Sequence, residues 1–271
     1  MTIPASGSSL PLTPNGTLKR FQPGSARPAF RREPANRPAA EIPGLSSDCR
    51  DCTARTRCLI TPWLAAELIS PDPSSLPSQV VERGSHIFRE GDAATGIYAV
   101  QSGMIKSYIL DANGSEHVLT FRGRGDLLGL DGLAQGMQTS SAVALETMAV
   151  CKVSMQQLEN LERRFPGWLC RLLTWELVRG RTTRQILSHK DARSRMAAFL
   201  LDFSRRSRVR GESMQGFNLS MSQQDIGNHL GLAVETVCRI LSSLRKSRLI
   251  DMDHHRLVIL DIDGLRGLAR N

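Results

Sequence analysis

Short apolar runs separated by glycine-rich turns fill the chain from about residue 80 to 153. The β-branched and aromatic residues in these runs predict strands over 86–88, 97–100, 104–110, 117–121 and 148–153. Asn113-Gly114 stands between the third and fourth of these runs, and this residue pair favours a two-residue hairpin turn. Closely spaced strands joined by such turns predict a small antiparallel barrel or roll.

Helical spacing follows the last predicted strand. Ser154 and Gln157 have the spacing of a capping box, which predicts a short helix starting after Ser154. A longer helix is predicted over 166–189, where apolar residues recur at steps of three and four. These apolar residues are Leu169, Leu172, Leu173, Leu177 and Ile186 or Leu187. They predict either a helix packed on its own domain or the seam of a dimer. Gly180 and the neighbouring arginines interrupt such a seam and would make the dimer weak.

The chain from residue 191 onward predicts a second, mainly helical domain. Amphipathic helices are predicted over 192–203, 222–230 and 234–244, followed by a β-hairpin that pairs 249–252 with 256–260. Ser222 is a favourable N-cap. Gly231 lies between two helices, where a left-handed backbone favours glycine. Two helices, a glycine turn and a following hairpin are typical of a winged helix-turn-helix.

The second of these helices carries residues suited to DNA recognition. Glu235, Cys238 and Arg239 share its outward face, because they lie at positions i, i+3 and i+4. A carboxylate can accept a hydrogen bond from cytosine, and a guanidinium can donate to guanine. The alternative is a surface ion pair between Glu235 and Arg239. Basic residues suited to phosphate contacts follow at Arg245, Lys246 and Arg248.

The composition adds a basic balance and a long tail to this pattern. The 271 residues carry a formal net charge of +9, which attracts a polyanion, although charge alone is weak evidence for nucleic acid. Proline, serine, glycine and arginine recur in residues 1–45, which predicts a solvated basic extension. No run of 18 apolar residues exists, and the first residues lack the pattern of an export signal. We therefore expect a cytoplasmic protein without a membrane span.

Six cysteines in a cytoplasmic chain favour metal binding or a reactive thiol over a disulfide framework. Three of them lie within ten residues in a polar stretch, at Cys49, Cys52 and Cys58. Four thiolates suit either structural zinc or a [4Fe–4S] cluster. The candidates for the fourth ligand are Cys151, Cys170 and Cys238. Zinc sites usually contain a second closely spaced pair of cysteines, such as another Cys-x2-Cys, and the sequence has none. The spacing therefore slightly favours the [4Fe–4S] cluster over zinc.

These features together resemble the CRP/FNR family of transcription regulators, and specifically its oxygen-sensing FNR branch. The resemblance covers about residues 49–265. It rests on the cysteine cluster with a lone fourth cysteine and on three segments, YAVQSGMIKSY at 98–108, GDLLGLDGL at 125–133 and DIGNHLGLAVETVCRIL at 225–241. It implies an α+β chain with an N-terminal β-roll sensory domain of the cyclic-nucleotide-binding type, a long dimerisation helix and a C-terminal winged helix-turn-helix.

The same resemblance implies a cofactor and a mode of action. It implies that an oxygen-labile [4Fe–4S] cluster is ligated by Cys49, Cys52, Cys58 and Cys151. Loss of the cluster in oxygen would weaken the homodimer and release DNA. The implied target is a palindromic site of the type TTGAT…ATCAA, whose bases are contacted through Glu235 and Arg239. The implied contact with RNA polymerase is a surface loop that includes Leu110, Gly114, Ser115 and Glu116.

Some positions depart from the family pattern. The family usually has serine where Cys238 stands, which leaves the base contact there open, and an apolar residue where Arg57 stands. Related cyclic-AMP receptors hold the nucleotide with a glutamate and an arginine-serine pair, and Leu130 and Ser140 stand at those places. Because a cyclic phosphate needs a cationic partner, we expect no cyclic-nucleotide binding.

The sequence thus predicts four parts and one function. The parts are a basic tail over 1–45, the cysteine loop and β-roll over 46–163, the dimerisation helix over 164–190 and the DNA-binding domain over 191–271. The expected function is oxygen-responsive, non-enzymatic regulation of anaerobic gene expression. Two alternatives stay open. One is a related regulator with structural zinc or another effector such as haem, and the other is an iron–sulfur electron-transfer protein, which would not need the helix-turn-helix.

Overall fold

The computed structural model describes residues 52, 54–56, 58 and 60 of the cysteine segment and the ranges 78–209 and 216–270. The expected basic tail over 1–45 lies outside the described residues, and so do Cys49 and Arg57. All structural statements below concern the described residues.

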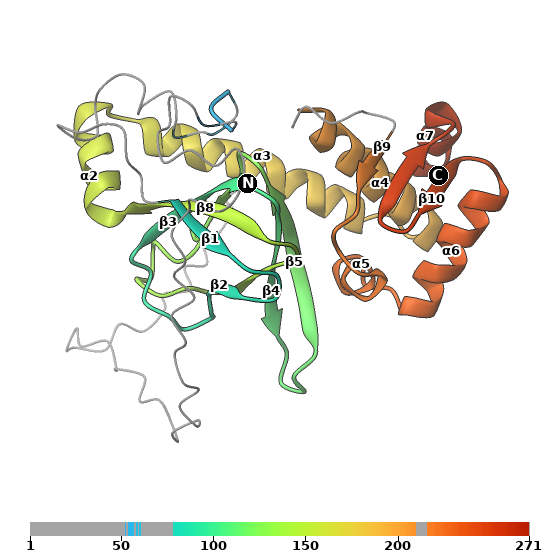
Figure 1. Ribbon diagram of the computed structural model, residues 1–271, viewed down its shortest axis with the longest axis horizontal. Helices are drawn as coiled ribbons and strands as arrows, with labels where there is room; N and C mark the ends of the chain where they lie inside the picture. The colour runs from blue at the N-terminus through green and yellow to red at the C-terminus, as the bar shows by residue number, and fades with distance from the viewer. Residues whose placement is uncertain are drawn as a thin grey trace, which may run out of the picture. The chain divides into compact units, whose positions relative to one another are not determined.

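Two four-stranded antiparallel sheets form the roll (Figure 1). Their strand orders are β1-β8-β3-β6 and β2-β7-β4-β5. The strands are β1 Ser78–Val81, β2 His86–Phe88, β3 Gly96–Ser102, β4 Met104–Leu110, β5 Glu116–Gly123, β6 Leu127–Leu128, β7 Ser141–Ala144 and β8 Met148–Ser154. The predicted strands of this region are thereby confirmed. Apolar side chains such as Val100, Ile105 and Val150 are fully buried in the roll.

The turn between β4 and β5 differs from the prediction. Leu110 pairs with Glu116, so the connection comprises 111–115, and the two-residue turn predicted at Asn113-Gly114 is wrong. The carboxylate of Asp111 accepts hydrogen bonds from two N–H groups within the loop, at 2.8 and 2.9 Å, which stabilises the longer turn. Gly114 has a φ of +82°, the left-handed conformation that a longer hairpin loop needs.

Three helices follow the roll, and the third of them begins the C-terminal domain. They are α2 Met155–Arg164, α3 Trp168–Leu187 and α4 Ala192–Val209. Both hydrogen bonds of the predicted capping box are present at the start of α2. α4 continues beyond its predicted end because Asp202 and Arg206 form an ion pair at 3.0 Å and the Arg206 guanidinium donates to the carbonyl oxygen of Phe121 at 2.9 Å. Within the described ranges, no helix combines the length and apolar character needed to cross a membrane.

The C-terminal domain is a winged helix-turn-helix. After α4, its elements are β9 Gly216–Asn218, α5 Gln223–Leu230, α6 Val234–Lys246, β10 Ile250–Asp253, β11 Arg256–Ile259 and α7 Ile262–Arg270, with the strand order β10-β11-β9. Gly231 ends α5 with a φ of +64°, as the helix-turn-helix pattern predicts. A Cβ atom at Gly227 would lie 2.6 Å from the carbonyl oxygen of Leu232, so glycine also allows α5 to approach the turn closely.

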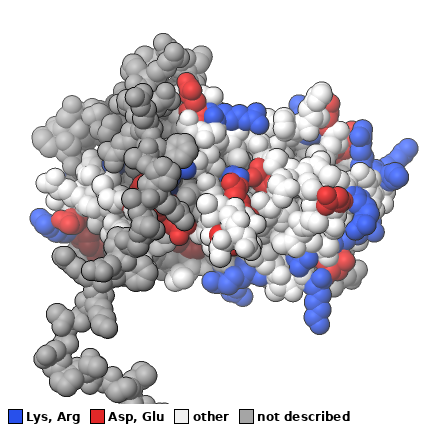
Figure 2. Space-filling view, turned by 90° about the horizontal axis from the view of Figure 1, so that it is seen from below, with Lys and Arg blue, Asp and Glu red and all other residues white. Residues whose placement is uncertain are grey.

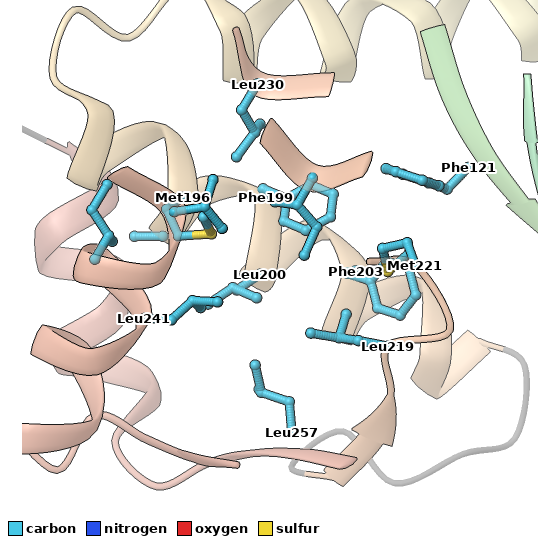
Figure 3. Close-up of a cluster of buried hydrophobic side chains, with 14 of the residues drawn as sticks. Phe121, Met196, Phe199, Leu200, Phe203, Leu219, Met221, Leu230, Leu241 and Leu257 are labelled. Atoms are coloured by element: carbon cyan, nitrogen blue, oxygen red, sulfur yellow. The ribbon is translucent and has the colours of Figure 1, made fainter. Parts of the chain in front are cut away.

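One hydrophobic cluster joins the roll to the C-terminal domain. Phe121 of β5 packs with Phe199 of α4, and the two ring centroids lie 6.1 Å apart (Figure 3). His229 of α5 is buried between these two rings, with centroid distances of 5.2 and 5.7 Å. Its Nδ1 lies 3.0 Å from the carbonyl oxygen of Val118 in β5. The first helix of the helix-turn-helix is therefore docked directly on the roll.

Burial of His229 predicts a pH dependence of this contact. Burial lowers the pKa of His229 below the ordinary 6.5, and the positive charge of Arg206 in α4 lowers it further. The hydrogen bond to Val118 and the negative charge of Asp202 in α4 act in the opposite direction without cancelling the decrease. The unfolded chain therefore binds a proton on this residue at a higher pH than the folded chain, and folding stability falls as pH drops below about 6.5. We expect the Tm to fall between about pH 7.5 and 5.5, and His229→Gln to reduce this slope.

His254 supplies the control, because its side chain is 93% exposed. His254→Gln should leave the pH slope of the Tm unchanged. Equal slopes for His229→Gln and the unaltered protein, measured by thermal unfolding, would contradict the role of His229.

Candidate functional site

The described part of the cysteine segment packs against the roll. Ala54 and Ile60 are almost completely buried. Ile60 belongs to a hydrophobic cluster that also contains Cys151, and Cys58 packs against this cluster. We call it the cysteine-side cluster; its buried members are Ile60, Ile97, Ala99, Leu127, Cys151, Val153, Leu158, Leu161, Trp168 and Leu172. Two cysteines that lie far apart in the sequence thus share one apolar environment.

Cys52 is held at the same sheet by a buried glutamine. Cys151, in β8, pairs with Ala99 of β3 on one side and with Ser78 of β1 on the other. Gln101 of β3 donates from Nε2 to the Cys52 sulfur at 3.6 Å, and its Oε1 accepts from the Ser78 hydroxyl at 2.8 Å. Gln101 could not be predicted from the sequence, because a glutamine near the end of a strand carries no signal of such a role.

The described cysteines do not form a preassembled metal site. Among the described residues, no group of three or more Cys, His, Asp or Glu side chains is arranged to hold a metal ion. Cys49 lies outside the described residues. The donor chemistry nevertheless fits a thiolate-ligated centre, since Cys52, Cys58 and Cys151 all lie at one side of the roll. Cys170 and Cys238 are exposed, on α3 and α6.

The start of α3 reaches the cysteine-side cluster. Trp168 and Leu172 are 3% and 4% exposed and belong to the same cluster as Cys151. Any change in the packing of the cysteine segment therefore acts on residues that also hold the first turns of α3.

Two arginine–carboxylate pairs fasten the middle of α3 to the roll. Arg122 donates both terminal nitrogens to the carboxylate of Glu176, at 3.0 and 2.6 Å. Arg179 donates likewise to Asp126, at 2.5 and 3.0 Å, and its guanidinium stacks on Trp175. Burial alone would raise the pKa of Asp126, but the Arg179 guanidinium outweighs it and holds that pKa below its usual value. Bidentate pairs of this kind fix orientation as well as distance.

The outer face of α3 is apolar and exposed. Leu173, Leu177 and Val178 are 44%, 65% and 62% exposed, whereas Leu172 and Ile186 are buried. The interpretation of this helix as packed on its own domain is confirmed for its buried side, and the dimer seam stays a prediction. One side packs on the roll, and the other leaves Leu173 and Leu177 exposed to solvent.

The helix-turn-helix presents its predicted recognition face to solvent. Glu235, Cys238 and Arg239 are exposed on α6, while Val237 and Leu244 are buried beneath them. The Cys238 thiol donates to Oε1 of Gln223 at 2.6 Å. Figure 2 shows Lys and Arg side chains projecting at its right-hand end, the end that holds α6 and β10 in Figure 1.

The loop expected to contact polymerase is mostly exposed. Leu110 is 50% exposed, and Gly114 and Ser115 are exposed at the tip. Glu116 is half-buried, because its carboxylate lies 2.5 Å from the ammonium group of Lys106.

A cavity of about 840 Å³ lies among the roll, α3 and α4. The hydroxyl of Ser140, at its edge, donates to the carboxylate of Asp131 at 3.3 Å. The lining arginines Arg122, Arg179 and Arg206 each pair with a carboxylate. Arg124, Arg184 and Arg205 also line this cavity, so the absence of cyclic-nucleotide binding stays a prediction from the sequence.

The chain is similar to known regulators over most of its length. A Crp-like helix-turn-helix domain model matches residues 194–268, and a cyclic nucleotide-binding domain model matches residues 78–165. The chain is 35% identical over 229 residues to the fumarate and nitrate reduction regulatory protein of Salmonella typhi, which covers 83% of this chain and 92% of that protein. It is 35% identical over 231 residues to electron transport regulator A of Shewanella oneidensis, with coverage of 84% and 92%.

The solved structure of FixK2 from Bradyrhizobium japonicum has the same architecture. It matches with a TM-score of 0.64 at 28% identity and covers 70% of this chain and 96% of that chain. The predicted α+β architecture, a β-roll followed by a helix-turn-helix, is confirmed.

Proposed function

Because the chain belongs to the CRP/FNR family of transcription regulators and carries the DNA-binding helix-turn-helix of that family, we propose that it controls anaerobic gene expression in response to oxygen. The proposal divides the chain into a sensory region over 46–163, a dimerisation helix over 164–190 and a DNA-binding domain over 191–271. The observation that carries it is the placement of Cys52, Cys58 and Cys151 at one side of the roll.

The proposed sensor is a [4Fe–4S] cluster held by Cys49, Cys52, Cys58 and Cys151. When bound, such a cluster supplies a redox centre that oxygen can destroy. The four thiolates would fasten the cysteine segment to β8. Ile60 and Cys58 would then stay packed on the cysteine-side cluster, which also holds Trp168 and Leu172 of α3.

The proposed output is dimerisation followed by DNA binding. With its first turns held, α3 presents Leu173 and Leu177 to a second copy. The dimer then places two α6 helices about 34 Å apart, one turn of DNA. Glu235 and Arg239 would contact bases in each half-site of a palindrome. The exposed loop with Leu110, Gly114 and Ser115, and Glu116 at its base, would contact RNA polymerase from this position.

The experiment that tests the sensor is purification without oxygen, followed by iron and acid-labile sulfide analysis and a visible spectrum. We expect iron, sulfide and a broad absorbance that disappears in air. Stoichiometric zinc without sulfide would instead support the structural-zinc alternative, and a haem spectrum would support that effector. A cluster-containing protein that binds no operator DNA would support an electron-transfer role.

Dimerisation through α3 predicts a large effect of a charge at Leu177. Leu177→Glu places a carboxylate in the apolar seam, so we expect a monomer and a loss of affinity for the palindrome of about 100-fold, since two linked half-sites bind far more tightly than one. Analytical ultracentrifugation and fluorescence anisotropy measure the two effects. Leu260→Glu is the matched control, because Leu260 is also exposed, at 56%, but lies outside α3. A Leu177→Glu protein that remains a dimer would contradict the proposed seam.

A further inference from the structure

A buried lysine of the roll bridges to the helix-turn-helix. Lys106, in the middle of β4, has a side chain that is only 11% exposed. Its Nζ lies 2.5 Å from a carboxylate oxygen of Glu116 in β5 and 2.6 Å from Oδ1 of Asp225 in α5. Lys106 and Asp225 are 119 residues apart in the sequence. A single ammonium group therefore connects the β4–β5 hairpin to the first helix of the DNA-binding domain.

The partner in α5 is the residue that closes the first turn of that helix. Oδ2 of Asp225 accepts from the Ser222 backbone N–H at 3.0 Å and from the Ser222 hydroxyl at 2.7 Å. Oδ1 accepts from Lys106. Burial opposes the charge on Lys106, but the hydrogen bonds with Asp225 and Glu116 outweigh burial and raise its pKa. Burial would likewise raise the pKa of Asp225, and Lys106 and Ser222 reverse this and lower it. The pair is thus charged in its buried setting.

A second contact lies one helical turn along α5. His229 follows Asp225 by four residues, so both side chains lie on the same face of the helix. His229 contacts the carbonyl oxygen of Val118 in β5 and packs on Phe121. Phe121 enters the interdomain cluster from the roll, toward Phe199 (Figure 3). Two contacts on one face, separated along the axis, fix both the position and the rotation of α5 on the roll.

We propose that Lys106 is a positioning residue for DNA recognition. It fixes α5 on the roll, and α5 carries α6 with it because Gly227 and Leu232 pack the two helices closely across the turn. The angle of each recognition helix relative to the dimer is then set by the roll as well as by α3. This inference rests on the proposed dimeric binding of a palindrome, in which the angle of each α6 decides which half-site spacing fits.

The test compares two DNA duplexes rather than one. The first carries the inverted repeat of TTGAT and ATCAA half-sites, and the second carries the same repeat with a spacer longer by about two base pairs, a fraction of one DNA turn. Lys106→Met keeps an unbranched side chain of similar length and removes the charge. We expect it to weaken binding to the first duplex about tenfold, a typical coupling between sites, and to weaken binding to the second duplex much less. We call the ratio of the affinities for the first and second duplexes the spacer discrimination. This ratio, measured by fluorescence anisotropy on oxygen-free protein, should therefore fall.

Two further variants separate positioning from general destabilisation. Asp225→Asn keeps an oxygen for the Ser222 N–H and removes the partner charge, so it should lower spacer discrimination like Lys106→Met, and the double variant should do no more than either single one. Lys152→Met, in β8, removes a lysine that stacks on Tyr98 away from α5 and should leave discrimination unchanged. A variant that merely folds less well would lose affinity for both duplexes by the same factor.

The inference is wrong if Lys106→Met binds both duplexes with the spacer discrimination of the unaltered protein. This failure differs from failure of the proposed function. If the proposed function is wrong, the unaltered protein itself would show no preference for either spacing, whatever residue stands at 106.

Discussion

Arg239→Ala is expected to abolish preference for the palindrome while leaving the protein dimeric and its iron content unchanged. Arg239 is exposed on α6, beside Glu235. Val237 and Leu244 are buried on the other side of the helix, so the side that carries Arg239 faces solvent. A guanidinium that contacts guanine contributes about 1–3 kcal/mol of base discrimination. A dimer makes this contact twice, so the affinity should fall about 100-fold or more. Competition anisotropy with specific and scrambled duplexes measures the loss.

Arg266→Ala provides the control for the loss of one positive charge. Arg266 is an exposed arginine of α7 that pairs with Asp263 at 2.9 Å. Its replacement should lower specific and non-specific binding equally and only slightly, since it removes charge without removing a base contact. If Arg239→Ala keeps the full ratio of specific to non-specific affinity, Arg239 does not contact bases.

Cys151→Ser should remove iron and sulfide from protein prepared without oxygen. Cys151 is 8% exposed between β1 and β3, and serine has nearly the same shape, so the fold should persist. The hydroxyl cannot replace the thiolate that iron–sulfur chemistry requires. Circular dichroism checks the fold, and elemental and sulfide analysis check the cofactor.

Cys170→Ser is the matched control for this replacement. Cys170 is exposed on α3 and does not belong to the cysteine-side cluster, so its replacement should leave iron and sulfide at the level of the unaltered protein. A Cys151→Ser protein that retains the full content of iron and sulfide would exclude Cys151 as a ligand. Another residue would then have to supply the fourth ligand.

Much of the fold could be predicted from local pattern. The strands of the roll and the helices α5 and α6 follow from alternation, helical spacing and capping residues such as Ser222. Two local predictions were too short. The hairpin loop is longer than Asn113-Gly114 suggests because the carboxylate of Asp111 bonds within it. α4 extends past residue 203, where Arg206 forms an ion pair with Asp202 of the same helix and donates to the carbonyl oxygen of Phe121 in β5.

The residues that connect the parts could not be predicted in the same way. Lys106 looks like an ordinary strand residue, and Asp225 looks like an ordinary helix cap. Their contact depends on two segments 119 residues apart meeting in the fold. The same holds for Gln101 and Cys52, which are 49 residues apart. Spacing and resemblance identify the candidate cysteines, but neither shows which buried side chains hold them.

The two sides of α3 differ in which of their residues are buried. The sequence left two interpretations, because its leucines lie on more than one side of the helix. Leu172 is buried, whereas Leu177 is exposed, and Glu176 and Arg179 pair with the roll. In the proposed dimer, a helix held in this way would transmit a change at the cysteine side to its exposed face.

The most direct measurement divides one oxygen-free preparation into two samples and exposes one of them to air. Iron, sulfide and affinity for the TTGAT and ATCAA inverted repeat are then measured on both. We expect the oxygen-free sample to contain the cluster and to bind the repeat at least about tenfold more tightly than the air-exposed sample. Equal affinity in an air-exposed sample that has lost its iron would contradict oxygen control of DNA binding.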